Sequence, residues 1–133
     1  MDTEARVLFV DDEQDLLELF AEEFSEKGIQ ILLARSGYEA MEKITAGSIS
    51  LVVTDYKMTH GDGISLANFC SDRGIACLVL TGHPIEEVRP YIPASMLVLN
   101  KARCMIEGSL ERAIRDAIAA HRNPGSTVPA QVA

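Results

Sequence analysis

Tryptophan is absent from the 133-residue sequence, and the other aromatic residues are only four phenylalanines and three tyrosines. The three cysteines, Cys70, Cys77 and Cys104, fit neither a disulfide framework nor a zinc-binding pattern. Each lies in an apolar stretch, so we expect them to be small core residues. Basic residues are also scarce, 12 against 20 acidic ones, which gives a net charge of -8. Such a surface repels nucleic acid, and we predict no direct nucleic-acid partner.

Long hydrophobic runs are missing as well, because no apolar stretch approaches the ~18 to 20 residues needed to cross a bilayer. The N-terminal stretch MDTEARVLF has acidic residues where a secretion signal has basic ones. We therefore expect no membrane insertion and a cytoplasmic location. What the chain does have is 47% hydrophobic and 24% charged residues, which is typical of a folded globular domain.

A chain of this length fits one domain, which we assign to residues 1–122. Residues 123–133, NPGSTVPAQVA, contain two prolines and a glycine without periodicity, and predict a flexible tail or the start of a linker.

Short apolar runs alternate with helical patterns five times along this domain. The runs predict strands at residues 6–10, 29–34, 50–54, 76–80 and 96–99. The segments between them predict a helix at 14–27 ended by Gly28, one opened by a capping box of Ser36 and Glu39, one ending at Gly74, a short one limited by Pro84 and Pro90, and a last one from Ile106 to Ile118.

Five strands separated by helices predict an α/β fold, with a parallel sheet covered on both faces. The connections must be right-handed crossovers, which leaves few strand orders. We expect the doubly wound, flavodoxin-like order 2-1-3-4-5, in which strands 1 and 3 are neighbours.

Acidic residues stand where these two neighbouring strands end. Asp11 and Asp12 follow the first strand directly, and Asp55 follows the third. Their carboxylates are expected at one edge of the sheet, where they repel each other unless a cation or shared protons intervene. Oxygen ligands suit Mg²⁺, which keeps several waters and completes its shell with a phosphate. The sequence therefore predicts a Mg²⁺ site at this edge.

A hydroxyl and an ammonium group are expected at the same edge. Thr81 ends the fourth strand and Lys101 follows the fifth. Together with the acids they provide what phosphoryl transfer to a carboxylate requires: the carboxylate attacks, the metal and lysine neutralise phosphoryl oxygens, and the hydroxyl bonds one of them.

Each of these residues also has a structural alternative. Asp12 or Glu13 could cap the first helix, Thr81 could be a loop residue, and Lys101 a solvated turn lysine. Asp55 is harder to explain structurally, since it precedes rather than opens a helix. The functional interpretation depends on all five residues reaching one edge from four strands.

Residues 5–122 resemble the receiver domain of response regulators, the CheY-like superfamily. The acidic pair, the aspartate after strand 3, the threonine and the lysine occur in the family's order. Met58 and Gly63 also stand three and eight residues after Asp55, as in the family's loop.

The resemblance implies that Asp55 is the phosphoacceptor, which takes a phosphoryl group from a histidine kinase or phosphotransfer protein and so switches binding to a downstream protein partner or a fused domain. It implies Mg²⁺ as the cofactor, ligated by Asp12, Asp55 and the backbone carbonyl of Lys57, with Asp11 acting through a water.

Further roles follow from the same resemblance. Thr81 and Lys101 would contact the phosphoryl oxygens. Lys57 and His83, two residues past Asp55 and Thr81, would flank the phosphoryl group and tune how fast it is lost. The structural alternative for His83 is a helix-start residue before Pro84.

Three positions depart from the family pattern. Thr59 stands where the family usually has proline, which loosens the loop after Asp55 without affecting the chemistry. Val98 stands where the family has a tyrosine or phenylalanine that turns inward on phosphorylation, which puts the usual signalling route in doubt. Ala102 replaces the proline that follows the lysine, often through a cis peptide bond. Because a cis bond without proline is costly, we expect a trans Lys101–Ala102 bond, with Lys101 still directed at Asp55.

Two other functions are weighed against this switch. A phosphorylation-independent interaction module is favoured by Val98 and Ala102 but opposed by the intact acids. An aspartyl-nucleophile phosphatase of the haloacid-dehalogenase kind needs a second carboxylate two residues after the nucleophile, where this chain has Lys57. We expect no enzyme turnover beyond the protein's own phosphorylation and dephosphorylation.

Overall fold

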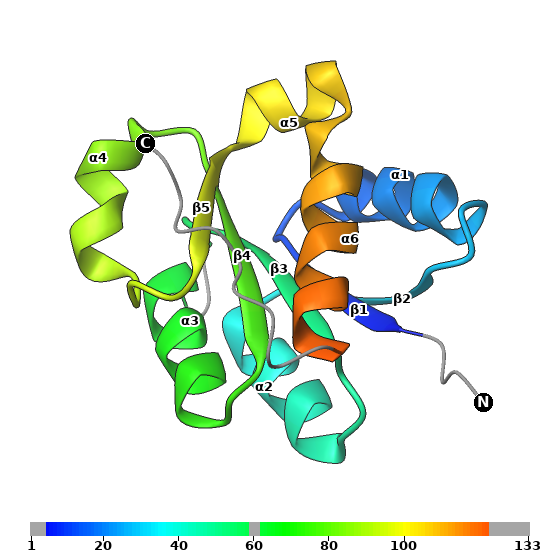
Figure 1. Ribbon diagram of the computed structural model, residues 1–133, viewed down its shortest axis with the longest axis horizontal. Helices are drawn as coiled ribbons and strands as arrows, with labels where there is room; N and C mark the ends of the chain where they lie inside the picture. Colours follow the sequence, from blue (N-terminus) through cyan, green and yellow to red (C-terminus); the bar gives the residue numbers. More distant parts are fainter. Residues whose placement is uncertain (1–4, 59–61, 123–133) are drawn as a thin grey trace.

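The computed structural model of the protein describes residues 5–58 and 62–122, so the tail predicted at 123–133 lies outside the described residues. The described strands are β1 (Arg6–Val10), β2 (Gln30–Ala34), β3 (Leu51–Asp55), β4 (Ala76–Thr81) and β5 (Leu97–Asn100). They form a parallel five-stranded sheet in the order β2-β1-β3-β4-β5 (Figure 1). The predicted fold class and strand order are confirmed.

The carboxyl ends of the strands differ slightly from the prediction. Asp55 is the last residue of β3 and pairs with Leu80, and Thr81 is the last residue of β4 and pairs with Asn100. Both polar residues are thus fixed by strand pairing rather than carried by loops.

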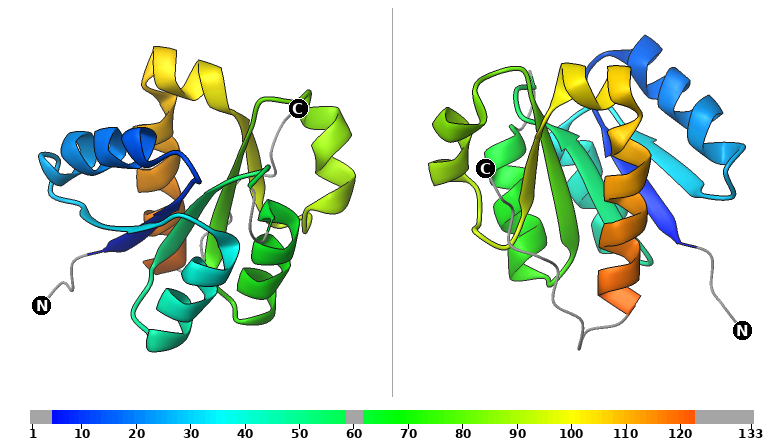
Figure 2. Two further views of the ribbon diagram at one scale, coloured as in Figure 1. Left: turned by 180° about the vertical axis from the view of Figure 1, so that it is seen from behind. Right: turned by 45° about the horizontal axis from the view of Figure 1, so that its top comes forward.

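Helices cover both faces of this sheet (Figures 1 and 2). The helices are α1 (Gln14–Ser25), α2 (Gly37–Ala46), α3 (Gly63–Asp72), α4 (Ile85–Val88), the 3₁₀ helix η1 (Arg89–Tyr91), α5 (Lys101–Glu107) and α6 (Ser109–Arg122). α1, α5 and α6 pack on one face, and α2, α3, α4 and η1 pack on the other. No described helix is long and apolar enough to span a bilayer.

The core is divided by the sheet into two apolar layers. Successive strand residues point to opposite faces, so Phe9 packs with Phe20 and Phe24 of α1, while Leu8 faces α2 and α3. All three cysteines are buried in these layers, as predicted.

Helix ends follow the predicted capping signals in most places. Gly28 adopts a left-handed conformation, with a φ of 77°, and its N–H donates to the Ser25 carbonyl while that of Ile29 donates to Phe24. This is the Schellman arrangement. The capping box at α2 is only half formed: Ser36 accepts from the Glu39 N–H at 3.0 Å, but the Glu39 carboxylate accepts from the N–H of Arg35.

The prediction of a single last helix from Ile106 is wrong, because the structure has two helices in this region. α5 begins at Lys101, directly after β5, and the Asn100 side chain caps it by accepting from the Arg103 N–H at 2.9 Å. Ala102 permits this start, since a proline at that position would disfavour helical backbone at Lys101. Gly108, left-handed with a φ of 68°, ends α5, and α6 begins at the next residue.

Candidate functional site

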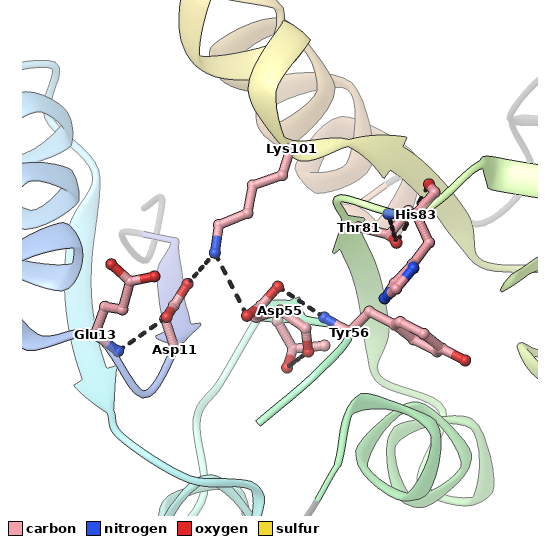
Figure 3. Close-up of polar contacts among 8 residues, drawn as sticks. Asp11, Glu13, Asp55, Tyr56, Thr81, His83 and Lys101 are labelled. Carbon is pink, nitrogen blue, oxygen red and sulfur yellow. Dashed lines mark hydrogen bonds and ion pairs between the residues drawn. The ribbon is translucent and has the colours of Figure 1, made fainter. Parts of the chain in front are cut away.

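Three carboxylates meet at the carboxyl edge of the sheet, as the strand order predicted. Asp11, Asp12 and Asp55 each offer one oxygen, and these oxygens lie within 4.8 Å of one another. Asp11 and Asp12 come from the turn after β1, and Asp55 comes from the end of β3. Figure 3 shows Asp11 and Asp55 on either side of the Lys101 ammonium group.

Asp11 is the most deeply fixed of the three, with a side chain only 4% exposed. Its backbone N–H donates to the Ala34 carbonyl, which extends the β1–β2 pairing. Its Oδ1 accepts from the N–H of Glu13, the N-cap residue of α1, at 3.0 Å. The Glu13 side chain makes no capping bond. Asp11 therefore joins the sheet edge to the start of α1.

The surroundings of Asp55 disfavour the ionised form of its carboxyl group. Its side chain is 14% exposed, and its Oδ1 accepts from the N–H of Tyr56 at 3.0 Å. Burial, together with the charge of Asp11, raises the pKa of Asp55 from 3.8 to about 6, although Lys101 and the Tyr56 N–H oppose the rise. Without a further cation, the ionised Asp55 carboxylate therefore lowers the stability of the folded protein.

Lys101 supplies the positive charge nearest to both acids. Its Nζ lies 2.8 Å from Asp11 Oδ2 and 3.4 Å from Asp55 Oδ2. Burial lowers the pKa of Lys101, but the bond to Asp11 and the charges of both carboxylates outweigh it, so the pKa is raised overall. No described peptide bond is cis. The predicted trans Lys101–Ala102 bond, with Lys101 directed at Asp55, is confirmed.

The Thr81 hydroxyl is engaged in its own turn. Thr81 is fully buried, and its Oγ1 accepts from the N–H of His83 at 2.8 Å. The His83 ring lies edge-on to the Tyr56 ring, with centroids 5.8 Å apart (Figure 3). The structure therefore brings four of the five predicted residues together, and leaves Thr81 beside them with its hydroxyl bonded to the loop.

A hollow of about 500 Å³ opens beside the acidic cluster. Asp12 and the exposed Lys57 line it, and its other walls come from Tyr56, Met58, Asp62 and Ile64. The hollow opens the Asp12 side of the acidic cluster to solvent.

Gly63, the first residue of α3, lets that helix lie close to the end of β3. A Cβ at this position would lie 2.6 Å from the Asp55 carbonyl oxygen and 2.9 Å from Tyr56, and the Gly63 N–H donates to the Tyr56 carbonyl at 3.0 Å. The sequence resemblance singled out Gly63 without this reason, which only the close approach of two backbones reveals.

Tyr56 and Arg89 were not singled out from the sequence. The Arg89 guanidinium donates to the carbonyls of Met96 at 2.6 Å and Pro93 at 2.6 Å, which ties down the turn before β5. Val98 of β5 is fully buried in the layer under α4 and pairs with Val79. The only sequence signal for the role of Arg89 was an arginine beside a proline-containing turn.

Comparisons with known proteins agree with this geometry. The sequence model of one protein family, the response regulator receiver domain, matches residues 7–92. The transcriptional regulatory protein GlrR of Escherichia coli is 30% identical over 81 residues, which is 59% of this chain but only 18% of that protein. The chain thus spans less than a fifth of the length of this curated relative.

Solved structures show the same fold. A response regulator receiver protein from Sinorhizobium medicae has a TM-score of 0.78 at 24% identity and covers 89% of this chain and 97% of its own. The response regulator TrrA of Thermotoga maritima, solved in complex with Mg²⁺-BeF, has a TM-score of 0.70 at 24% identity, with 85% and 98% covered. Since the family model also matches more than half of the sequence, the chain belongs to the response regulator receiver domains, the signalling domains of two-component systems.

Proposed function

We propose that this protein is a Mg²⁺-dependent phosphorylation switch in which Asp55 accepts a phosphoryl group from a histidine kinase or phosphotransfer protein. The observation that carries the proposal is the cluster of Asp55 with Asp11 and Asp12, in which the Lys101 ammonium group lies 3.4 Å from Asp55 and Asp12 lines an open hollow. A carboxylate that serves only structure has no need of this setting.

The donor set fits a hard divalent cation. Three carboxylate oxygens within 4.8 Å face one ammonium group, which leaves an excess of negative charge, and all the donors are oxygens. Asp12, Asp55 and the Lys57 carbonyl would hold Mg²⁺, with Asp11 acting through a water. When bound, the ion would supply charge neutralisation for the phosphoryl oxygens. The Mg²⁺-BeF complex of the Thermotoga maritima protein supports this assignment.

The transfer needs an ionised Asp55. With a pKa of about 6, the carboxylate is mostly ionised at pH 7. A carboxylate oxygen attacks the phosphorus of a phosphohistidine, the P–N bond breaks, and its electron pair stays on the imidazole nitrogen, which leaves an acyl phosphate on Asp55. Lys101, 3.4 Å from Asp55 Oδ2, would neutralise a phosphoryl oxygen.

Thr81 would join this arrangement only after a local change. Its Oγ1 now accepts from the His83 N–H, and a rotation toward Asp55 would release that bond. His83 and Lys57 remain the side chains proposed to tune loss of the phosphate. Binding of a downstream protein, or of a further domain in a longer protein, would then report the change.

A constitutive interaction module is the alternative, and the buried Val98 is the observation in its favour. Valine has no ring to move between an exposed and a buried position. The intact cluster of acids and lysine favours the switch.

Intact-mass measurement after incubation with acetyl phosphate and Mg²⁺ tests the proposal. We expect one added phosphoryl group in the parent protein, and none in the Asp55→Asn variant or in excess chelator. Absence of any added mass, together with unchanged amide spectra during a beryllium fluoride titration of the folded protein, would establish the constitutive alternative.

A further inference from the structure

A second hollow, which we call the amino-end hollow, lies at the opposite end of the strands from the acidic cluster, where β4 and β5 begin. Its volume is about 340 Å³. Most of its walls are apolar, and five of the apolar residues are only half-buried: Ile75, Ala76, Leu97, Ala117 and Ala120. A segment that covered these residues would remove apolar surface from water, which stabilises the folded state.

The amino-end hollow exists because α6 carries small side chains where it passes the start of the sheet. Helix α6 runs along β4 and ends on the side where β4 starts (Figure 1). Ile114 of this helix is fully buried in the core, but Ala117 and Ala120, the next residues on the same face, are alanines that line the hollow. Their short side chains leave open the space that larger ones would fill.

The segment that follows α6 has a composition that suits this hollow. Residues 123–133, NPGSTVPAQVA, lie outside the described residues, and none of the 12 basic and 20 acidic residues of the chain falls among them. Val128, Pro129 and Val132 are apolar. Segments that stay unfolded in water are typically rich in charge, so an uncharged segment with three apolar side chains gains more from an apolar site.

The sequence directly after α6 also directs the chain toward the hollow. Asn123, Pro124 and Gly125 predict a type II turn, with proline at its second position and glycine at its third. Ala120, which lines the hollow, is only two residues before Arg122, the last residue of α6. Val128 is six residues past Arg122 and can lie up to about 20 Å from it. A chain that turns back at this point therefore reaches the hollow.

We propose that residues 126–132 of this chain bind in the amino-end hollow, with Val128 and Val132 against its apolar walls. The covalent link favours this occupant, because a segment tethered by a few residues has an effective concentration on the order of mM. A second copy of the chain is disfavoured, since each copy carries a net charge of -8. The proposal goes beyond phosphoryl transfer and does not depend on it.

NMR spectroscopy of the ¹³C,¹⁵N-labelled full chain tests the proposal. We expect nuclear Overhauser effects between the methyl groups of Val128 or Val132 and those of Ile75 or Leu97, which line the hollow. Backbone order parameters of residues 127–132 should reach about 0.8, whereas a segment free in solution gives values below about 0.6.

Matched variants separate binding in the hollow from order of another origin. Ala120→Lys fills the hollow with a long side chain, and Ala119→Lys places the same side chain at an exposed neighbouring position outside the lining. Lysine is favoured near the C-terminus of a helix, so both variants keep α6. The order parameters of residues 127–132 should fall below about 0.6 in Ala120→Lys and stay near those of the parent in Ala119→Lys. Val128→Ser/Val132→Ser should release the segment in the same way, and Gln131→Ser should not.

The proposal is overturned by order parameters below about 0.6 for residues 127–132 of the parent, by methyl contacts of Val128 with another surface, or by equal loss of order in Ala119→Lys. Contacts that disappear on dilution would also overturn it, because they would assign the hollow to the segment of a second copy. Phosphoryl uptake from acetyl phosphate is measured separately. Failure of uptake would contradict the phosphorylation switch and leave the result at the amino-end hollow standing.

Discussion

Replacing Asp55 with asparagine is predicted to stabilise the protein at neutral pH in the absence of divalent cations. Burial and the charge of Asp11 raise the pKa of Asp55 from 3.8 to about 6, against the opposing effects of Lys101 and the Tyr56 N–H. The folded protein therefore holds the Asp55 proton more tightly than the unfolded chain does. The contribution of this group to stability is greatest below about pH 4 and is lost as the pH rises through about 6.

The size of the effect follows from the difference between the two pKa values. A rise from 3.8 to about 6, at about 1.4 kcal/mol for each pH unit, corresponds to about 3 kcal/mol at pH 7. Asparagine resembles the protonated acid, and its side-chain oxygen still accepts from the Tyr56 N–H. Some contact of Asp55 with water reduces the difference, so we expect the free energy of unfolding of the variant to exceed that of the parent by about 2 kcal/mol.

Urea unfolding followed by circular dichroism measures this difference, since the chain has no tryptophan for fluorescence. Measurements are made with chelator at pH 7 and at about pH 4, with Asp116→Asn as a control on an exposed aspartate in the middle of α6. The advantage of Asp55→Asn should shrink at the lower pH, and added Mg²⁺ should stabilise the parent more than the variant. A variant no more stable than the parent at pH 7, or an advantage that persists at pH 4, would refute the reasoning.

Three further substitutions probe the acidic edge and the buried layer under α4. Lys101→Met leaves Asp11 and Asp55 without their ammonium group and should lower the free energy of unfolding at pH 7 by about 3 kcal/mol. The loss should be smaller at acidic pH, and an unchanged urea midpoint would contradict the pairing. Gly63→Ala places a Cβ 2.6 Å from the Asp55 carbonyl oxygen, so we expect about 1 to 3 kcal/mol of destabilisation and slower phosphoryl uptake. Uptake and melting like those of the parent would argue against the close approach. Val98→Phe overfills a fully buried position and should cost about 1 to 3 kcal/mol in thermal or urea unfolding; a neutral effect would show unfilled space beneath α4.

The sheet and its acidic edge were predictable because the signals for them are local and repeated. Apolar runs such as LVV in β3 and LVL in β4 predict strands buried on both faces, and their alternation with helices leaves few parallel topologies. Once strands 1 and 3 are neighbours, Asp11 and Asp55 must lie close, and the structure places their oxygens within 4.8 Å. Lys101 is brought to the same edge by the end of β5.

The details that failed depend on side-chain bonds that no periodicity reports. Apolar spacing in the last segment predicted one helix, but the Asn100 cap and the left-handed Gly108 decide where α5 starts and stops. The orientation of the Thr81 hydroxyl was equally hidden, because a neighbouring N–H, that of His83, competes for it. Hydrogen bonds of this kind depend on the conformation of the folded loop, which the strand order does not determine.

Lys101 is the residue at which the site and the departure from the family pattern meet. In this chain it is the first residue of a helix, because Ala102 allows helical backbone where a proline would not, and its ammonium group reaches Asp11 at 2.8 Å. Helix α5 therefore starts at the acidic edge itself, because its first residue supplies the ammonium group of the cluster and Asn100, the last residue of β5, caps it by accepting from the Arg103 N–H.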